Sequence, residues 1–224
     1  MIDAQSSVRA AVPPFGHGRA WRHAARCVRD WLRRREAQRR WRQQGHPLPV
    51  PPHVKRALLR KRAQRNGLRV FIETGTLFGD TLAALRRHFE ELHSIELDPE
   101  LYRKAAARFA NDPKVTLWHG DSGEVLPRVL EGVGQPVLFW LDGHYAGEGT
   151  ARGAEDTPIR RELAHIARHA LSRMHLIVVD DARLFDGRNH YPGLEDLQAY
   201  VATLGFGHML LENDMILISG HPCL

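Results

Sequence analysis

From residue 68 onward, short apolar runs alternate with stretches in which apolar residues recur every three or four positions. The short runs are rich in Val, Ile, Leu and Phe, which is typical of buried strands, whereas the longer spacing is typical of amphipathic helices. The expected strands are residues 69–73, 92–97, 115–119, 136–142, 176–180, 208–212 and 215–219. The expected helices are residues 80–89, 99–110, 123–131, 158–169 and 193–204.

Because helices separate successive strands over most of this region, we expect right-handed crossovers and parallel strands. The last two strands are separated only by Asn213 and Asp214, a typical hairpin turn, so the final strand should run antiparallel. The pattern therefore predicts an α/β fold, Rossmann-like and doubly wound. Its mostly parallel seven-stranded sheet would have an antiparallel last strand, with a basic helical extension at the N-terminus.

The extension differs in composition from the rest of the chain. Residues 1–18 contain Pro, Gly and Ser and are typical of a flexible lead-in, and residues 19–44 have the pattern of a basic helix. Four prolines between residues 47 and 52 predict a stiff linker, and a second basic helix is expected over residues 54–66. We therefore expect a basic arm over residues 1–52 and one folded domain over residues 53–224.

The net charge of +6 conceals an uneven distribution. Residues 1–66 carry 17 Lys or Arg against three acidic residues, whereas the remainder carries 15 basic and 23 acidic residues, a net charge of −8. Several partners for the basic arm stay open. It could bind nucleic acid, with Trp21, Trp31 and Trp41 stacking on bases, dock on an anionic membrane surface, or join two copies in a homo-oligomer.

Targeting and redox signals are weak in this chain. No apolar run approaches the ~20 residues that a membrane-spanning helix needs, and residues 1–20 lack the apolar core of a signal peptide. Cys27 and Cys223 are the only cysteines, too few for a disulfide framework or a zinc site by themselves. These features favour a cytoplasmic location.

A glycine-containing turn follows the first expected strand. Its sequence is Glu73, Thr74, Gly75, Thr76, Leu77, Phe78 and Gly79. A strand, a glycine turn and a helix N-terminus together form the usual cradle for a nucleotide-like ligand. The spacing Glu-x-Gly-x-x-x-Gly differs from the Gly-x-Gly-x-x-Gly pattern of dinucleotide-binding proteins, so a dinucleotide is disfavoured.

Acidic and hydroxyl residues follow the next two strands, at the edge where ligands bind in open α/β sheets. Glu96 could accept the hydroxyl protons of a ribose, or could be a solvated residue before a helix. Asp121 and Ser122 could lie beside an adenine amine, and both residue types also favour the N-cap of the following helix. These two roles are compatible.

Three aspartates end the fourth and fifth expected strands. Asp142, Asp180 and Asp181 would lie close together, because neighbouring strands are about 4.8 Å apart. Crowded carboxylates repel one another unless a cation joins them, and ligation by oxygen alone suits Mg²⁺, Ca²⁺ or Mn²⁺. The alternative is that Asp142 and Asp180 merely end strands while Asp181 faces water. His144 is a candidate general base near neutral pH.

In this order, the residues resemble a class I S-adenosylmethionine-dependent methyltransferase over about residues 54–220. Residues 73–79 match the turn that holds the methionine part of the cofactor in that family. Glu96 matches the acidic residue that binds the ribose, and Asp121 with Ser122 matches the position that contacts the adenine. The resemblance implies a methyltransferase domain over residues 53–224 with S-adenosylmethionine as its cofactor.

Within that family, Asp142, Asp180 and Asp181 resemble the metal site of divalent-metal-dependent O-methyltransferases of the macrocin and catechol types. This implies a bound Mg²⁺ and O-methylation of a small hydroxylated or saccharide acceptor. Unlike the catechol-type pattern, no lysine follows Asp142, so His144, with Asp142, is the expected catalytic group. Nucleic-acid methylation through the basic arm and a non-catalytic, cofactor-binding protein are the alternatives.

Overall fold

A computed structural model describes residues 32–33, 35–143 and 157–222 of the chain. The chain divides into two units, residues 1–46 and 47–224. In the first unit, residues 35–43 are helical. The second unit holds the sheet and begins six residues before the predicted boundary at residue 53.

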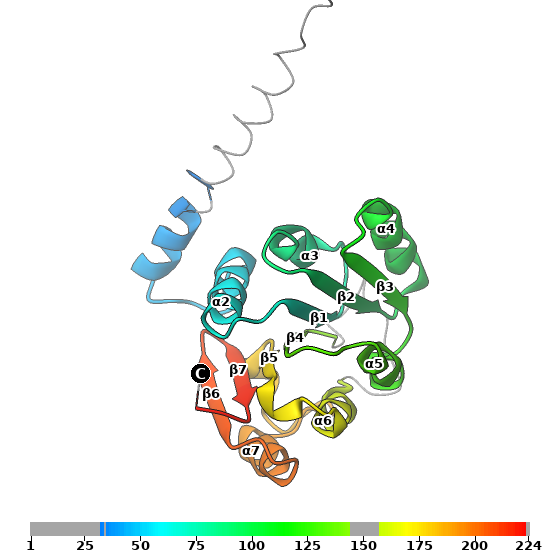
Figure 1. The fold of residues 1–224 in the computed structure, drawn as a ribbon. Helices are drawn as coiled ribbons and strands as arrows, with labels where there is room; N and C mark the ends of the chain where they lie inside the picture. Colours follow the sequence, from blue (N-terminus) through cyan, green and yellow to red (C-terminus); the bar gives the residue numbers. More distant parts are fainter. Residues whose placement is uncertain (1–31, 34, 144–156, 223–224) are drawn as a thin grey trace, which may run out of the picture. The chain divides into compact units, whose positions relative to one another are not determined.

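The second unit is built on a seven-stranded sheet in the order β3-β2-β1-β4-β5-β7-β6 (Figure 1). The strands are β1 (Val70–Thr74), β2 (Glu91–Glu96), β3 (Val115–His119), β4 (Val137–Leu141), β5 (Leu176–Val179), β6 (His208–Glu212) and β7 (Met215–Ser219). The first five run parallel, and β7 lies antiparallel between β5 and β6. The predicted fold class and the reversed last strand are confirmed.

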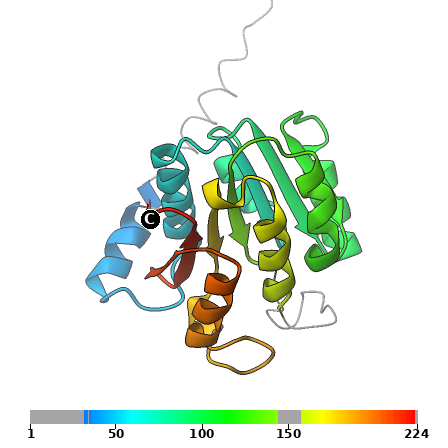
Figure 2. The same cartoon turned by 60° about the horizontal axis from the view of Figure 1, so that its bottom comes forward.

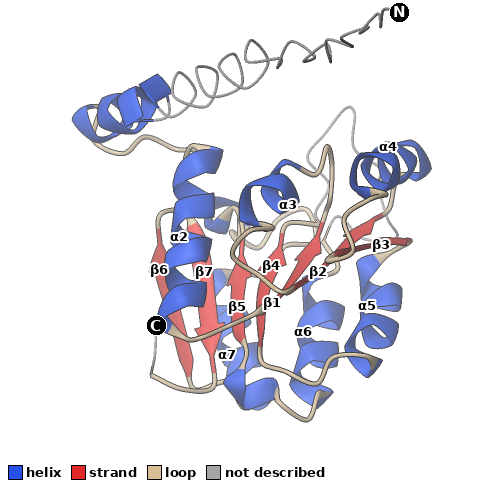
Figure 3. Cartoon of the chain, turned by 45° about the horizontal axis from the view of Figure 1, so that its top comes forward, coloured by secondary structure: helices blue, strands red, loops and turns tan. Residues whose placement is uncertain are grey.

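Six helices in the described part of this unit cover the two faces of the sheet. They are α2 (Pro52–Arg65), α3 (Asp80–Leu85), α4 (Pro99–Phe109), α5 (Ser122–Glu131), α6 (Ile159–Arg168) and α7 (Leu194–Thr203). Residues of α2, α3 and α4 pack into one hydrophobic cluster, and residues of α5, α6 and α7 pack into the other (Figure 3). Figure 2 brings the second group forward, with α5 green, α6 yellow-green and α7 orange. The strands β1, β4, β5 and β7 are thus buried on both faces, whereas the edge strands β3 and β6 are partly exposed.

Two local features differ from the sequence prediction. The helix α3 ends at Leu85, four residues earlier than expected. Two short 3₁₀ helices, Ser172–Met174 and Ala182–Leu184, flank β5. The second one follows Asp181, whose φ of 52° lies in the left-handed region, so the chain turns sharply as soon as β5 ends.

The hairpin between β6 and β7 has the predicted two-residue turn. Asn213 and Asp214 have φ values of 51° and 60°, as a type I′ turn requires, and Asn and Asp tolerate that region. The carbonyl oxygen of Asp214 accepts a hydrogen bond from the Ala182 N–H at 2.8 Å. The hairpin turn is thereby attached to the segment that follows β5.

The described residues contain no helix that is long and apolar enough to cross a membrane. Most of the basic arm falls in residues 1–31, outside the described part of the chain. Its predicted partners stay predictions.

Two stacked histidines join the C-terminal end of α6 to the start of β5. His175 Nδ1 accepts a hydrogen bond from the Val137 N–H, so His175 carries its proton on Nε2 and donates it to His169 Nδ1, 2.9 Å away. His169 Nε2 then donates to the Val133 carbonyl oxygen. Burial, with a smaller contribution from His169, lowers the pKa of His175 to about 3.

This histidine pair makes the fold sensitive to acid. The unfolded chain binds a proton at His175 with an ordinary pKa of about 6.5, whereas the folded chain binds it only near pH 3, so stability falls as the pH falls through this interval. We predict that His175→Gln, which keeps an acceptor but cannot titrate, loses less stability than the wild type between pH 7 and pH 4. Urea unfolding at several pH values measures this. The same substitution at exposed His119 is the control, and equal profiles for all three proteins would contradict the assignment.

Candidate functional site

The turn between β1 and α3 lies where the strand order reverses, between β1 and β4. Gly75 has a φ of +84°, and its N–H donates to the Ile95 carbonyl oxygen at 2.9 Å. A Cβ on Gly75 would lie only 2.5 Å from the Asp142 carbonyl oxygen. Only glycine therefore fits, and the backbones of β1 and β4 meet closely at the point where open α/β sheets bind ligands.

Gly79 ends the turn and is the N-cap of α3 in a left-handed conformation. A Cβ there would lie 2.6 Å from the Phe109 ring, so the second glycine of the motif lets α3 and α4 approach each other. Between the two glycines, Leu77 and Phe78 are exposed. The turn is thus anchored at both glycines and presents apolar side chains outward.

Glu96 holds this turn from the end of β2. Its Oε2 accepts a hydrogen bond from the Leu77 N–H at 2.7 Å, and its Oε1 accepts one from the Asp98 N–H at 2.9 Å. These bonds fix Leu77, which has a left-handed φ of 50°. Each carboxylate oxygen can accept a further bond, so the ribose role predicted for Glu96 is compatible with this geometry.

Glu73 is fully buried at the end of β1, and its carboxyl group is hydrogen-bonded to a chain of two hydroxyl groups. Ser94 Oγ donates to Glu73 Oε2 at 2.8 Å, so Thr76 must be the donor in its 2.6 Å contact with Ser94. Burial raises the pKa of Glu73 to about 8, with the Ser94 hydrogen bond and the charge of Arg56 opposing the shift. Glu73 is therefore mostly protonated at neutral pH.

A cavity of about 190 Å³ opens beside the glycine turn. It brings together the predicted residues Glu73, Gly75, Thr76, Asp142 and Asp180. It is also lined by Leu77 and Phe78 of the turn and by residues that the sequence prediction did not assign to the site, namely Pro52, Lys55, Arg56, Asp80, Thr81 and Trp140. Trp140 is buried, and its Nε1–H has no hydrogen-bond partner among the described residues.

The other predicted cofactor residues do not line this cavity. Thr74 is buried in β1, packed close to Gly143. Asp121 is the N-cap of α5, where it accepts from the Gly123 N–H at 2.7 Å and pairs with Arg161 at 3.1 Å. Ser122 begins α5 and is buried. The capping role is confirmed, and contact with an adenine stays a prediction.

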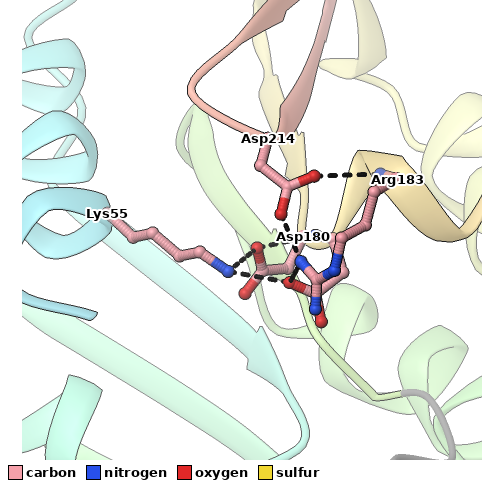
Figure 4. Close-up of polar contacts among 5 residues, drawn as sticks. Lys55, Asp180, Arg183 and Asp214 are labelled. Carbon is pink, nitrogen blue, oxygen red and sulfur yellow. Dashed lines mark hydrogen bonds and ion pairs between the residues drawn. The ribbon is translucent and has the colours of Figure 1, made fainter. Parts of the chain in front are cut away.

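Lys55 reaches from α2 to the end of β5 (Figure 4). Its ammonium group donates to Oδ1 of Asp180 and, at 2.8 Å, to Oδ1 of Asp181. Arg183 donates to the same Asp181 oxygen at 2.7 Å and forms a further ion pair with Asp214. Two cations and three carboxylates thus form one continuous network.

This network differs from the predicted metal site. Asp142 and Asp180 line the same cavity, but Asp180 and Asp181 share Lys55 as a partner. Across residues 32–33, 35–143 and 157–222, no three His, Cys, Asp or Glu side chains are grouped so that they could hold a metal ion. The described side chains therefore do not fit the expected set of three free carboxylate ligands. His144, the predicted base, lies outside the described residues.

The charges in this network stabilise one another. Burial lowers the pKa of Lys55, but the charges and hydrogen bonds of Asp180 and Asp181 outweigh it, so the pKa is raised above its ordinary value. Burial, together with the charge of Asp181, raises the pKa of Asp180 to about 6, although Lys55 opposes the shift. Above pH 7, Lys55 is a cation and Asp180 is mostly an anion.

A helical pattern could have identified Lys55 from the sequence. Lys55 is three and four positions before Leu58 and Leu59, so it lies on the buried face of α2. A lysine on such a face needs a buried partner of opposite charge. Sequence alone could not say that this partner lies 125 residues away.

By sequence, the chain matches no family model and no curated protein. By structure, it is similar to methyltransferases. The SAH-bound methyltransferase PaMTH1 from Podospora anserina superposes with a TM-score of 0.53 at 15% identity, covering 94% of this chain and 99% of that one. A Staphylococcus aureus protein described as a caffeoyl-CoA O-methyltransferase gives 0.52 at 15% identity, covering 87% and 98%.

A third similar structure is an O-methyltransferase from Bacillus cereus in complex with SAH. Its TM-score is 0.51 at 14% identity, and the match covers 82% of this chain and 88% of that one. The chain therefore has the Rossmann-like fold of class I O-methyltransferases.

Proposed function

We propose that the protein is an S-adenosylmethionine-dependent methyltransferase that methylates a hydroxyl oxygen of a small acceptor, of which a saccharide is one candidate. The observation that carries this proposal is the cavity beside the Gly75 turn, at the position where the strand order reverses. The likeness to SAH-bound methyltransferase structures supports it.

In this proposal, the cofactor lies along the carboxyl ends of β1, β2 and β3. The turn of residues 73–79 holds the methionine part, Glu96 accepts the ribose hydroxyls, and Asp121 with Ser122 contacts the adenine. Lys55 and Trp140 line the same cavity as Gly75, and the Lys55 ammonium suits a polar acceptor.

Methyl transfer then proceeds in one displacement. The acceptor oxygen attacks the methyl carbon, the bond from carbon to sulfur breaks, and a methyl ether and S-adenosylhomocysteine form. The hydroxyl proton passes to a nearby base, for which His144 and Asp142 are the candidates. Metal assistance is not part of this proposal, because Lys55 already binds two of the three expected carboxylate ligands.

We predict that Gly75→Ala weakens binding of S-adenosylhomocysteine by about tenfold or more. The new Cβ would clash with the Asp142 carbonyl oxygen, so the backbone segments that follow β1 and β4 must move apart. Isothermal titration calorimetry measures the affinity. Gly187→Ala is a matched control, because Gly187 has nearly the same φ, +83°, but nothing within 4 Å of the added Cβ. Both variants carry similar backbone strain, so equal affinities for the ligand would place the cofactor elsewhere.

Glu73 lines the cavity, and its protonation state gives a second test of the site. The folded protein keeps a proton on Glu73 up to about pH 8, whereas the unfolded chain releases it near an ordinary pKa of 4.5, so the wild type loses stability as the pH rises through this interval. We predict that Glu73→Gln is more stable relative to the wild type at pH 9 than at pH 5. Chemical unfolding measures the difference, with Gln at exposed Glu131 as the control. A difference that is constant with pH would contradict the protonated state of Glu73.

A further inference from the structure

The carboxylates that would hold a metal are already bound to a cation of the chain itself. Lys55 Nζ donates to Oδ1 of both Asp180 and Asp181, and Oδ1 of Asp180 also accepts the Asp181 N–H at 2.7 Å. A divalent ion between these carboxylates would lie against the ammonium group, where the two positive charges repel. The ion and the ammonium group therefore compete for the same place.

The position of Lys55 is fixed by the packing of α2. The helix begins at Pro52, whose ring favours the first turn, and Leu58, Leu59 and Ala63 bury its inner face in the cluster that covers the sheet. The Lys55 side chain itself is 9% exposed. A buried stem on an anchored helix cannot swing into solvent without leaving Asp180 uncompensated.

The positive charge of Lys55 is stabilised by its surroundings. Its two carboxylate partners lie within hydrogen-bond distance of the ammonium group and stabilise its charged form. Of its three N–H groups, two are used by Asp180 and Asp181 in the described chain. One N–H is left for a ligand in the cavity that Lys55 lines.

The surroundings indicate a ligand on this side of the cavity. Trp140 and Asp180 line it together with Lys55, and the buried Trp140 Nε1–H has no partner among the described residues. Asp142 lies in the same wall and has no lysine after it in the sequence. Lys55, from a helix distant in sequence, is thus the cation that contacts both Asp180 and Asp181 at this strand edge.

We propose that the Lys55 ammonium is a built-in cation that takes the place of a divalent metal: it holds Asp180 and Asp181 together and donates its remaining N–H to the acceptor oxygen. The second clause rests on the proposed methyltransferase function, whereas the first stands without it. A cation at this position orients the acceptor and stabilises negative charge that develops on its oxygen. Methyl transfer then needs no added metal.

The wild-type protein provides the first test. Titration with Mn²⁺, followed by electron paramagnetic resonance of the free ion, should show no stoichiometric site at micromolar to low millimolar concentrations. EDTA should leave both the affinity for S-adenosylhomocysteine and the melting temperature unchanged. A single Mn²⁺ site that is lost in Asp180→Asn would overturn the proposal.

The second test removes the ammonium group. Lys55→Met keeps the length of the stem and removes the ammonium group that Asp180 and Asp181 share, while Arg183 still pairs with Asp181, so we predict that Mn²⁺ binding tightens by about tenfold or more. Lys55→Arg should keep the wild-type behaviour, and Lys55→Met combined with Asp180→Asn should lose the gained site. A folded Lys55→Met protein that binds Mn²⁺ no better than the wild type would overturn the proposal, and if this variant does not fold, the wild-type titration decides.

These readouts are independent of the proposed function. Failure of the wild type to bind S-adenosylhomocysteine would contradict the cofactor site but leave the Mn²⁺ results interpretable. Conversely, normal cofactor binding together with a wild-type Mn²⁺ site at Asp180 would contradict only the role of Lys55.

Discussion

The arrangement of the site depends on the buried contact of Lys55 with Asp180 and Asp181. It joins α2, which precedes the sheet in sequence, to the end of β5, and through Arg183 it extends to the β6–β7 turn. Removing one partner of a buried ion pair typically costs about 3–5 kcal/mol, because a charge is left without compensation. The wall of the cavity that contains Asp180 therefore depends on α2 staying in place, and the same contact fills the position that a metal ion would need.

A second constraint acts where the backbone segments that follow β1 and β4 come into contact. Gly75 allows the two backbones to approach, and Glu96 fixes the rest of the turn through the Leu77 N–H. In the proposed function, this contact would shape the side of the site that holds the methyl donor, and Lys55 the side that holds the acceptor. Because both open on one cavity, a cofactor at the turn would place its reactive group close to the carboxylates at the ends of β4 and β5.

The sequence was sufficient to predict the elements whose signals are local. Strand positions followed from apolar runs, the reversed last strand from Asn213 and Asp214, and the turn from its two glycines. The end of α3 and the 3₁₀ helix after Asp181 were not predicted, because tertiary contacts decide them. The aspartates at the strand ends were found, but their partner was not: Lys55 is far away in sequence and comes from the second basic helix, at the start of the predicted domain. Pairing across that distance depends on how α2 packs, which no local pattern contains.

The most direct test of this account is a crystal structure of the wild-type protein grown with S-adenosylhomocysteine and Mn²⁺, with diffraction recorded at the manganese absorption edge. The account predicts the ligand against Gly75 with its ribose at Glu96, Lys55 bound to Asp180 and Asp181, and no anomalous peak among the aspartates. A ligand bound away from the glycine turn, or a manganese peak between Asp142, Asp180 and Asp181 with Lys55 displaced, would contradict it.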